Sequence, residues 1–98
     1  MGKKPATRAE KAHLNAVAAL GCIVCRDNGY YDTPAEIHHV LGGGVRASAY
    51  ECIPLCHIHH RNGGWGDAVH NGTRTWEARH GTQRELLAKT LTLLKERV

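Results

Sequence analysis

Two short motifs constrain the fold of this chain more than any other feature of its sequence. Cys22 and Cys25 are separated by two residues, and Cys56 and His59 are separated by two residues as well. Two such pairs, brought together in a fold, give a tetrahedral site of three cysteines and one histidine, a common arrangement for structural zinc. One pair alone would decide little, whereas two matched pairs favour a zinc site over buried cysteines without a ligand.

The aromatic content explains why a chain of 98 residues would need such a site. It contains no Phe, two Trp and three Tyr, so its core must be built largely from Ala, Leu, Val and Ile. A domain this small with so few large side chains usually needs a metal or disulfides for stability. The basic start, Met1 to Pro5, has no apolar stretch behind it, so we expect a reducing compartment, where disulfides are rare. Two disulfides are therefore the less favoured alternative to zinc.

A short hairpin is predicted between the two motifs. Residues 36–41 and 51–55 have β character, and the loop between them is long and contains glycine. Cys52 is out of phase with the metal ligands, so we expect it to be a buried strand residue. The fourth zinc ligand stays open at this point, because His57 or His60 could replace His59.

Helices are predicted before and after this hairpin. The segments Thr7-Arg8-Ala9-Glu10 and Thr82-Gln83-Arg84-Glu85 are capping boxes, in which a Thr and a Glu three residues later satisfy two backbone N–H groups. The first helix should run to Leu20 and end at Gly21, and a polar loop should follow over 26–34.

The C-terminal part should contain two more helices. Residues 73–80 form the shorter one, with Trp76 facing inward and Gly81 ending it. The longer one carries a stripe of leucines that favours a core over a partner-binding face. These are Leu86, Leu87, Leu91, Leu93 and Leu94. The prediction is thus a basic tail over 1–6 and a single α+β domain over 7–98.

The histidines form a second pattern. His38 and His39 are adjacent on a predicted strand, so their side chains should point to opposite faces and serve different purposes. One could bind a metal while the other acts as a general base. A metal bound by His38, His60 and His70 would leave positions open for water and substrate, as catalytic metals do.

Taken together, these motifs resemble the HNH nucleases, whose core is a ββα-metal finger. Within that superfamily the chain is most similar to the phage-encoded Ref recombination-enhancement nucleases, over roughly residues 13 to 90. The segments that carry the resemblance are His13-Leu14, Leu20 to Cys25, Pro34 to His39, Ile53 to Cys56, His59-His60-Arg61 and Thr75-Trp76-Glu77.

The resemblance implies a role for each candidate residue. The fold would be a zinc-stabilised HNH core with an N-terminal helix and C-terminal helices. His38 would bind the catalytic metal with His60 as a further ligand, and His39 would be the general base. His70 is our candidate for a third ligand. Glu51 stands where the pattern has its middle Asn, and it is a candidate for orienting His39 or binding metal. The structural zinc would be held by Cys22, Cys25, Cys56 and His59.

The expected function is that of a metal-dependent DNA endonuclease using Mg²⁺, Mn²⁺ or Zn²⁺, phage-encoded and cytoplasmic. Its formal net charge of +4 permits DNA binding. Candidate phosphate-binding residues are Lys3, Lys4, Arg46 and Arg61. The resemblance also implies a RecA-type filament as a partner, although the basic start is short and leaves RecA dependence open. No membrane span is expected. The alternatives are a zinc-stabilised DNA-binding module without catalysis and an adaptor that binds a recombinase.

Overall fold

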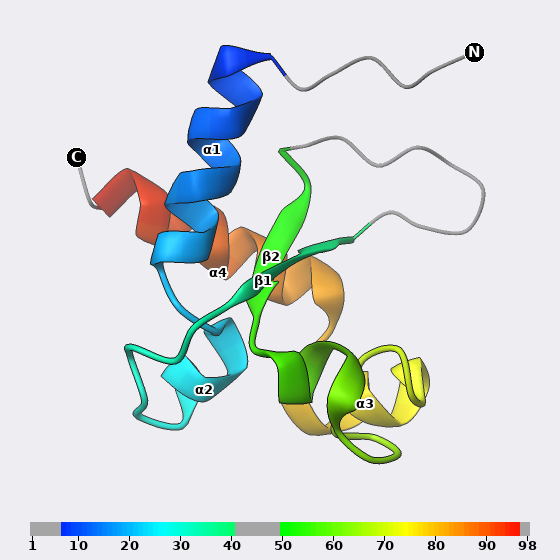
Figure 1. Cartoon of the computed structure of the whole chain (residues 1–98). Coiled ribbons are helices and arrows are strands. Elements are labelled where there is room, and N and C mark those ends of the chain that lie inside the picture. The colour runs from blue at the N-terminus through cyan, green and yellow to red at the C-terminus, as the bar shows by residue number, and fades with distance from the viewer. Residues whose placement is uncertain (1–6, 41–49, 97–98) are drawn as a thin grey trace, which may run out of the picture.

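The structure is a computed structural model that describes residues 7–40 and 50–96 (Figure 1). Four α-helices, one turn of π-helix and a two-stranded sheet make up this part of the chain, so the α+β prediction is confirmed. In chain order the elements are α1 (Arg8–Ala19), α2 (Ile23–Asp27), β1 (Glu36–His39), β2 (Cys52–Leu55), η1 (Ile58–Asn62), α3 (Thr73–His80) and α4 (Gln83–Glu96). None of the described helices combines the length and the apolar character that crossing a bilayer requires.

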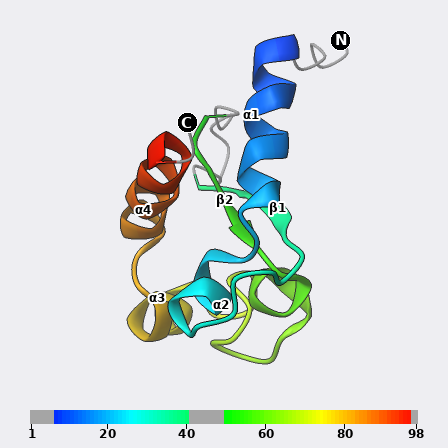
Figure 2. The ribbon, with the colours of Figure 1, turned by 90° about the vertical axis from the view of Figure 1, so that its left-hand side faces the viewer.

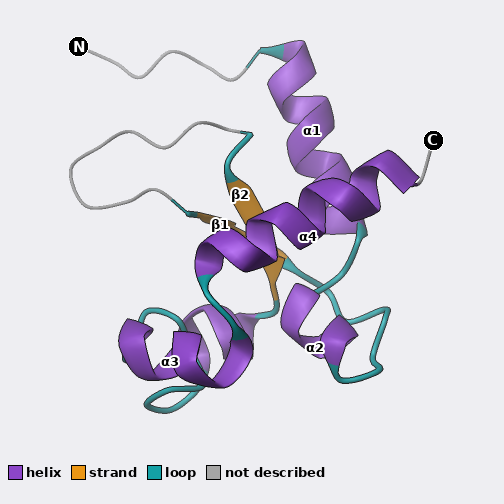
Figure 3. Cartoon of the chain, turned by 180° about the vertical axis from the view of Figure 1, so that it is seen from behind, coloured by secondary structure: helices purple, strands orange, loops and turns teal. Residues whose placement is uncertain are grey.

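The sheet is the predicted hairpin. Strands β1 and β2 pair antiparallel, with Glu36 opposite Leu55 and His39 opposite Cys52. All four residues of β2 are buried, including Cys52, as expected. Strand β2 contacts α1, α2, α4 and η1, and α4 lies across the sheet (Figure 3). The second strand is therefore the element around which the rest of the domain packs.

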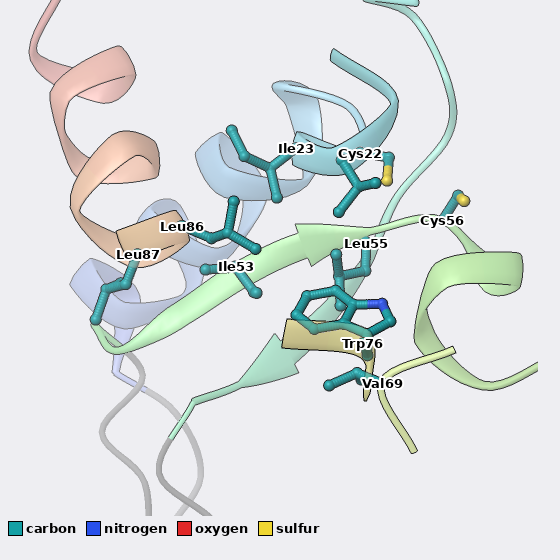
Figure 4. Packing of buried hydrophobic residues seen from close by; sticks show 10 residues of the cluster. Cys22, Ile23, Ile53, Leu55, Cys56, Val69, Trp76, Leu86 and Leu87 are labelled. Carbon is teal, nitrogen blue, oxygen red and sulfur yellow. The ribbon is translucent and has the colours of Figure 1, made fainter. Parts of the chain in front are cut away.

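The hydrophobic core lies between β2 and the helices (Figure 4). Trp76 of α3 is fully buried and faces inward as predicted, close to Leu55 and Val69. In α4, Leu86 and Leu87 are buried, whereas Leu91 is 37% exposed. The prediction of a leucine core thus holds for Leu86 and Leu87, holds in part for Leu93, which packs against the core while partly exposed, and fails for Leu91.

Both capping boxes are present. In the first, the backbone N–H of Glu10 donates to the Thr7 hydroxyl at 3.1 Å, and Thr7 N–H donates to the Glu10 carboxylate at 2.8 Å. Thr82 and Glu85 make the same pair of bonds at 2.9 and 3.1 Å. The N-terminal part of α1 extends beyond the rest of the described chain (Figure 2). Packing against other elements stabilises these first turns little, so the capping hydrogen bonds of Thr7 and Glu10 matter more for them.

The prediction of an irregular loop from Arg26 onward was wrong at its start, because α2 continues to Asp27. The N-cap of this short helix is Cys22, whose sulfur accepts a hydrogen bond from the backbone N–H of Cys25 at 3.5 Å. The helix is preceded by Gly21 at φ 78°, where a Cβ atom would lie 2.8 Å from the carbonyl oxygen of Tyr31. A glycine is needed at this close approach, and it allows α2 to turn back toward β2.

Candidate active site and metal centres

The two pairs of residues singled out in the sequence meet in one partly buried cluster, which we call the cysteine-rich group. Its ligand atoms all lie within 4.8 Å of one another, and its members are Cys22, Cys25, Cys56 and His59. Cys25 Sγ lies 3.8 Å from Cys56 Sγ. The Nδ1 atom of His59 lies 3.6 Å from Cys22 Sγ, 3.6 Å from Cys25 Sγ and 3.2 Å from Cys56 Sγ.

These separations fit a tetrahedral zinc ion. Zinc bonds of about 2.3 Å to sulfur and about 2.0 Å to nitrogen place the corners of a tetrahedron about 3.8 Å apart for two sulfurs and about 3.5 Å apart for sulfur and nitrogen. The three soft sulfurs and the imidazole are also the donor types that zinc prefers. The group can hold zinc, with His59 as the fourth ligand.

The neighbours of His59 point elsewhere. His57 is exposed, with its Nδ1 atom 3.1 Å from the side-chain nitrogen of Asn62. His60 belongs to a different cluster. The sequence left His57, His59 and His60 as candidates for the position beside the three sulfurs. In the structure, His59 of η1 is the one that faces them.

Burial affects the protonation of the sulfurs in this group. Burial raises the pKa of the Cys22 thiol to about 12. A thiolate in such surroundings needs a positive charge beside it, and a bound metal ion supplies that charge. All four cysteines are free thiols, so no disulfide competes for these sulfurs.

A second cluster, which we call the three-histidine group, consists of His38, His60 and His70. They come from β1, from η1 and from the segment before α3. The ring centroid of His38 lies 5.2 Å from those of both other rings, which are 4.8 Å apart. Burial lowers the pKa of His38, which favours the neutral imidazole that a metal ligand requires. The three residues that the sequence selected for a second metal are thus brought together.

The orientation of His60 is fixed by Glu36. The Nδ1–H of His60 donates to Glu36 Oε1 at 2.9 Å, which leaves Nε2 to face a metal. Arg61 binds the same carboxylate through its Nε atom at 2.9 Å and through a second nitrogen. Hydrogen bonds from Arg61 and His60 lower the pKa of Glu36 to about 2. This acceptor is therefore negatively charged throughout the neutral range.

His38 is oriented in a similar way by Gln83. Its Nε2–H donates to Gln83 Oε1 at 2.8 Å, so Nδ1 is the nitrogen left for a metal. Sequence reasoning missed Gln83 and Glu36. Glu36 could have been found, because it lies two residues before His38 on the same face of a strand. Gln83 lies 45 residues from His38, and no local pattern connects the two.

The three-histidine group lines an open cleft of about 480 Å³. His39 lines the same cleft and is exposed, whereas His38 is only 8% exposed. The two histidines therefore differ in exposure, as the alternation of a strand predicts, but both line the same cleft, and only His38 belongs to the three-histidine group. Thr73 at the start of α3 and Gln83 at the start of α4 complete the polar part of the lining.

The remaining candidate residues have other surroundings. The Glu51 carboxylate lies 3.2 Å from a guanidinium nitrogen of Arg84, and Glu51 belongs to neither metal-capable group among the described residues. Arg61 is exposed, but its guanidinium is directed at Glu36. Lys3, Lys4 and Arg46 lie outside the residues that the structure describes.

A family model described as recombination enhancement, RecA-dependent nuclease matches residues 6–95, which is nearly the whole chain. The chain belongs to this family. The resemblance noted from the motifs is thereby confirmed, and the HNH assignment is consistent with it. The RecA-dependent nucleases are named for nuclease activity and for recombination, so DNA and RecA are the molecules that this membership implies.

Proposed function

We propose that this protein is a metal-dependent DNA endonuclease of the HNH type, with His39 as its general base. The observation that carries the proposal is the exposed His39 on the wall of the same cleft that the three-histidine group lines. A closed four-ligand group lies apart from it and is suited to stabilising the fold. One closed and one open site is the division expected of a structural and a catalytic metal.

His39 would take a proton from the water that attacks phosphorus, since imidazole titrates near neutral pH. A divalent cation such as Mg²⁺, Mn²⁺ or Zn²⁺, held by the three-histidine group, would stabilise the charge that develops on the phosphate and on the departing 3′ oxygen. Glu36 and Gln83 keep the rings of His60 and His38 fixed during this step. The P–O bond to the 3′ oxygen breaks as the bond to the water oxygen forms.

DNA would be held mainly through its phosphates. Lys3, Lys4 and Arg46 are proposed contacts, together with Arg61 where DNA competes with Glu36 for its guanidinium. Glu51 is a proposed positioning residue for His39. It directly precedes Cys52, the residue that pairs with His39 across the sheet. Family membership supports action with a RecA-type filament. Such a filament lies in the cytoplasm of a bacterium, so we propose that the protein is phage-encoded and acts in the cytoplasm of the host.

The direct test is cutting of supercoiled plasmid and of single-stranded circles with Mg²⁺ or Mn²⁺, with and without a RecA filament. The wild type should cut in at least one of these mixtures, and a chelator should stop it. His39→Ala should lower the rate by about 100- to 10,000-fold, the usual contribution of a general base, with an unchanged melting temperature.

The matched control is His57→Ala, which removes another exposed histidine that belongs to neither group. It should cut at the wild-type rate. Cutting by His39→Ala at the wild-type rate would show that another residue is the base. A wild type that binds DNA and cuts in none of the mixtures would favour the non-catalytic DNA-binding module, and one that binds only RecA would favour the adaptor.

A further inference from the structure

The segment between η1 and α3 carries an unusual surface residue. Trp65 is 72% exposed, more than any other large hydrophobic side chain in the described ranges. The chain has only one other Trp, Trp76, and that residue is completely buried in the core. The exposed indole is thus no part of the hydrophobic core, and its position decides what it could contact.

The Trp65 ring is held in place on the backbone of Gly72. A Cβ atom at Gly72 would lie 2.9 Å from Cε2 of the indole, so the ring lies against the glycine itself. Gly72 has a φ of 96°, which also favours glycine. The N–H of Gly66 donates to the carbonyl oxygen of Asn71 at 2.8 Å and ties the two ends of the segment together. The indole therefore has a defined position.

That position is next to the cleft. Gly72 is followed directly by Thr73, and His70 lies two residues before it. Both Thr73 and His70 line the cleft. The indole therefore lies against a residue that is bonded directly to the lining of the cleft, while Trp65 itself is not among the lining residues.

The surroundings of Trp65 identify the kind of ligand. Within its own segment the neighbours are Gly64, Gly66 and Asp67, and the exposed Asn71 lies close by. A hydrophobic anchor of a protein interface usually sits among well-packed neighbours that exclude water, and none of these four neighbours has a large apolar side chain. Stacking of a nucleobase needs one aromatic face with free access, and a glycine-rich segment leaves such access.

We propose that Trp65 is a stacking platform for an unpaired nucleobase of the DNA strand whose phosphodiester enters the cleft. The inference rests on the proposed function, because the stacked base belongs to the strand that is cut. Bases in an intact duplex are stacked on one another, so the platform gives the enzyme a preference for single-stranded or locally opened DNA. Every base has a π-face, so the preference carries little sequence information.

The test uses the fluorescence of the zinc-loaded full chain, without added Mg²⁺, during titration with a short oligothymidylate. Binding should quench Trp65, since Trp76 is buried and serves as the constant background. Trp65→Ala should abolish the quenching and weaken binding, measured by anisotropy of a labelled oligothymidylate, by about five-fold or more. Trp65→Phe should retain most of the affinity, and a duplex of the same length should bind wild type and Trp65→Ala alike.

The control is Tyr30→Ala, which removes a side chain of comparable exposure, 69%, from the segment after α2. This segment and the one between η1 and α3 lie on opposite sides of the molecule (Figure 1). Tyr30→Ala should bind as the wild type does. Equal affinity of Trp65→Ala and wild type for the oligothymidylate, or an equal loss in Tyr30→Ala, would overturn the proposal.

Two further results would be just as decisive. A defect of Trp65→Ala toward a RecA filament but not toward free oligothymidylate would overturn nucleobase stacking in favour of protein docking. Because the titration involves no cleavage, a protein that binds through Trp65 and never cuts would contradict the proposed function alone. A protein that cuts and is indifferent to Trp65→Ala would contradict only the stacking platform.

Discussion

The cysteine-rich group and the three-histidine group share the segment around η1 and differ in almost everything else. The first has four ligands, three of them sulfur, and two of its cysteines are fully or almost fully buried. The second has three imidazoles, one of them exposed, and it opens into a cleft. One turn of π-helix supplies a residue to each group, with His59 turned one way and His60 the other.

The difference shows how a small chain separates stability from chemistry. The four ligands of the cysteine-rich group join α2 to the end of β2, so a metal there stabilises segments that few large side chains hold together. Two of the three histidines, His60 and His38, are positioned by hydrogen bonds to Glu36 and Gln83, so we expect the fold not to depend on a metal between the three. Substitutions within each group test this separation.

The largest effect is expected from Cys56→Ser. It removes one sulfur from the closed group, and we expect loss of one zinc per chain and destabilisation by more than about 4 kcal/mol, as for other losses of a structural metal. Thermal unfolding and metal analysis measure both. The matched control is Cys52→Ala, a change at a buried cysteine outside the group, which should keep its zinc and lose about 1 kcal/mol. A Cys56→Ser protein with unchanged zinc and melting temperature would end the structural interpretation.

His70→Ala should have the opposite profile. The side chain is exposed, so the free energy of unfolding should change by less than about 1 kcal/mol, and the zinc of the cysteine-rich group should stay. Cutting should fall by more than about 100-fold, since partners that merely orient a ligand already contribute 10- to 100-fold. If the variant unfolds or releases that zinc, the two groups are coupled and the separation is wrong.

Glu36→Ala should have a smaller effect on the same site. Without the acceptor for Nδ1–H, His60 is free to rotate, and the apparent affinity for the catalytic metal should fall by about 10- to 100-fold. Titration of cutting rate with Mn²⁺ measures this shift, and Glu36→Gln should recover part of it. Asp27→Asn, which breaks the ion pair of Asp27 with Lys89 at 2.8 Å, is the control and should leave the titration unchanged. An equal shift in both variants would argue against a specific role for Glu36.

The smallest effect concerns a cap that belongs to neither group. Hydrogen bonds from Thr82 hold the pKa of Glu85 below its usual value of 4.5. Its carboxylate therefore adds stability above about pH 4.5, and this contribution is lost as the pH falls toward the folded pKa. The melting temperature of the wild type should exceed that of Glu85→Gln at neutral pH, and this difference should shrink as the pH falls. A difference that stays constant down to about pH 3 would contradict this account.

Much of the fold followed from local rules. Each capping box needs only residues three apart in sequence, and both are formed as expected. The face on which His38 lies follows from the alternation of a strand. Two pairs of residues, each separated by two positions, predicted the cluster of Cys22, Cys25, Cys56 and His59. Helix α2 was missed because its N-cap is a cysteine, which is not among the usual capping residues.

Sequence alone thus determined that this chain is a small α+β domain with one group of sulfur ligands and one of histidines. Only the tertiary structure decided which of three successive histidines joins the sulfurs, that Gln83 and Glu36 orient the others, and that Glu51 meets Arg84. The reason is physical. Periodicity and capping act over a few residues, whereas each of these choices depends on segments 24 to 45 residues apart approaching to hydrogen-bond distance.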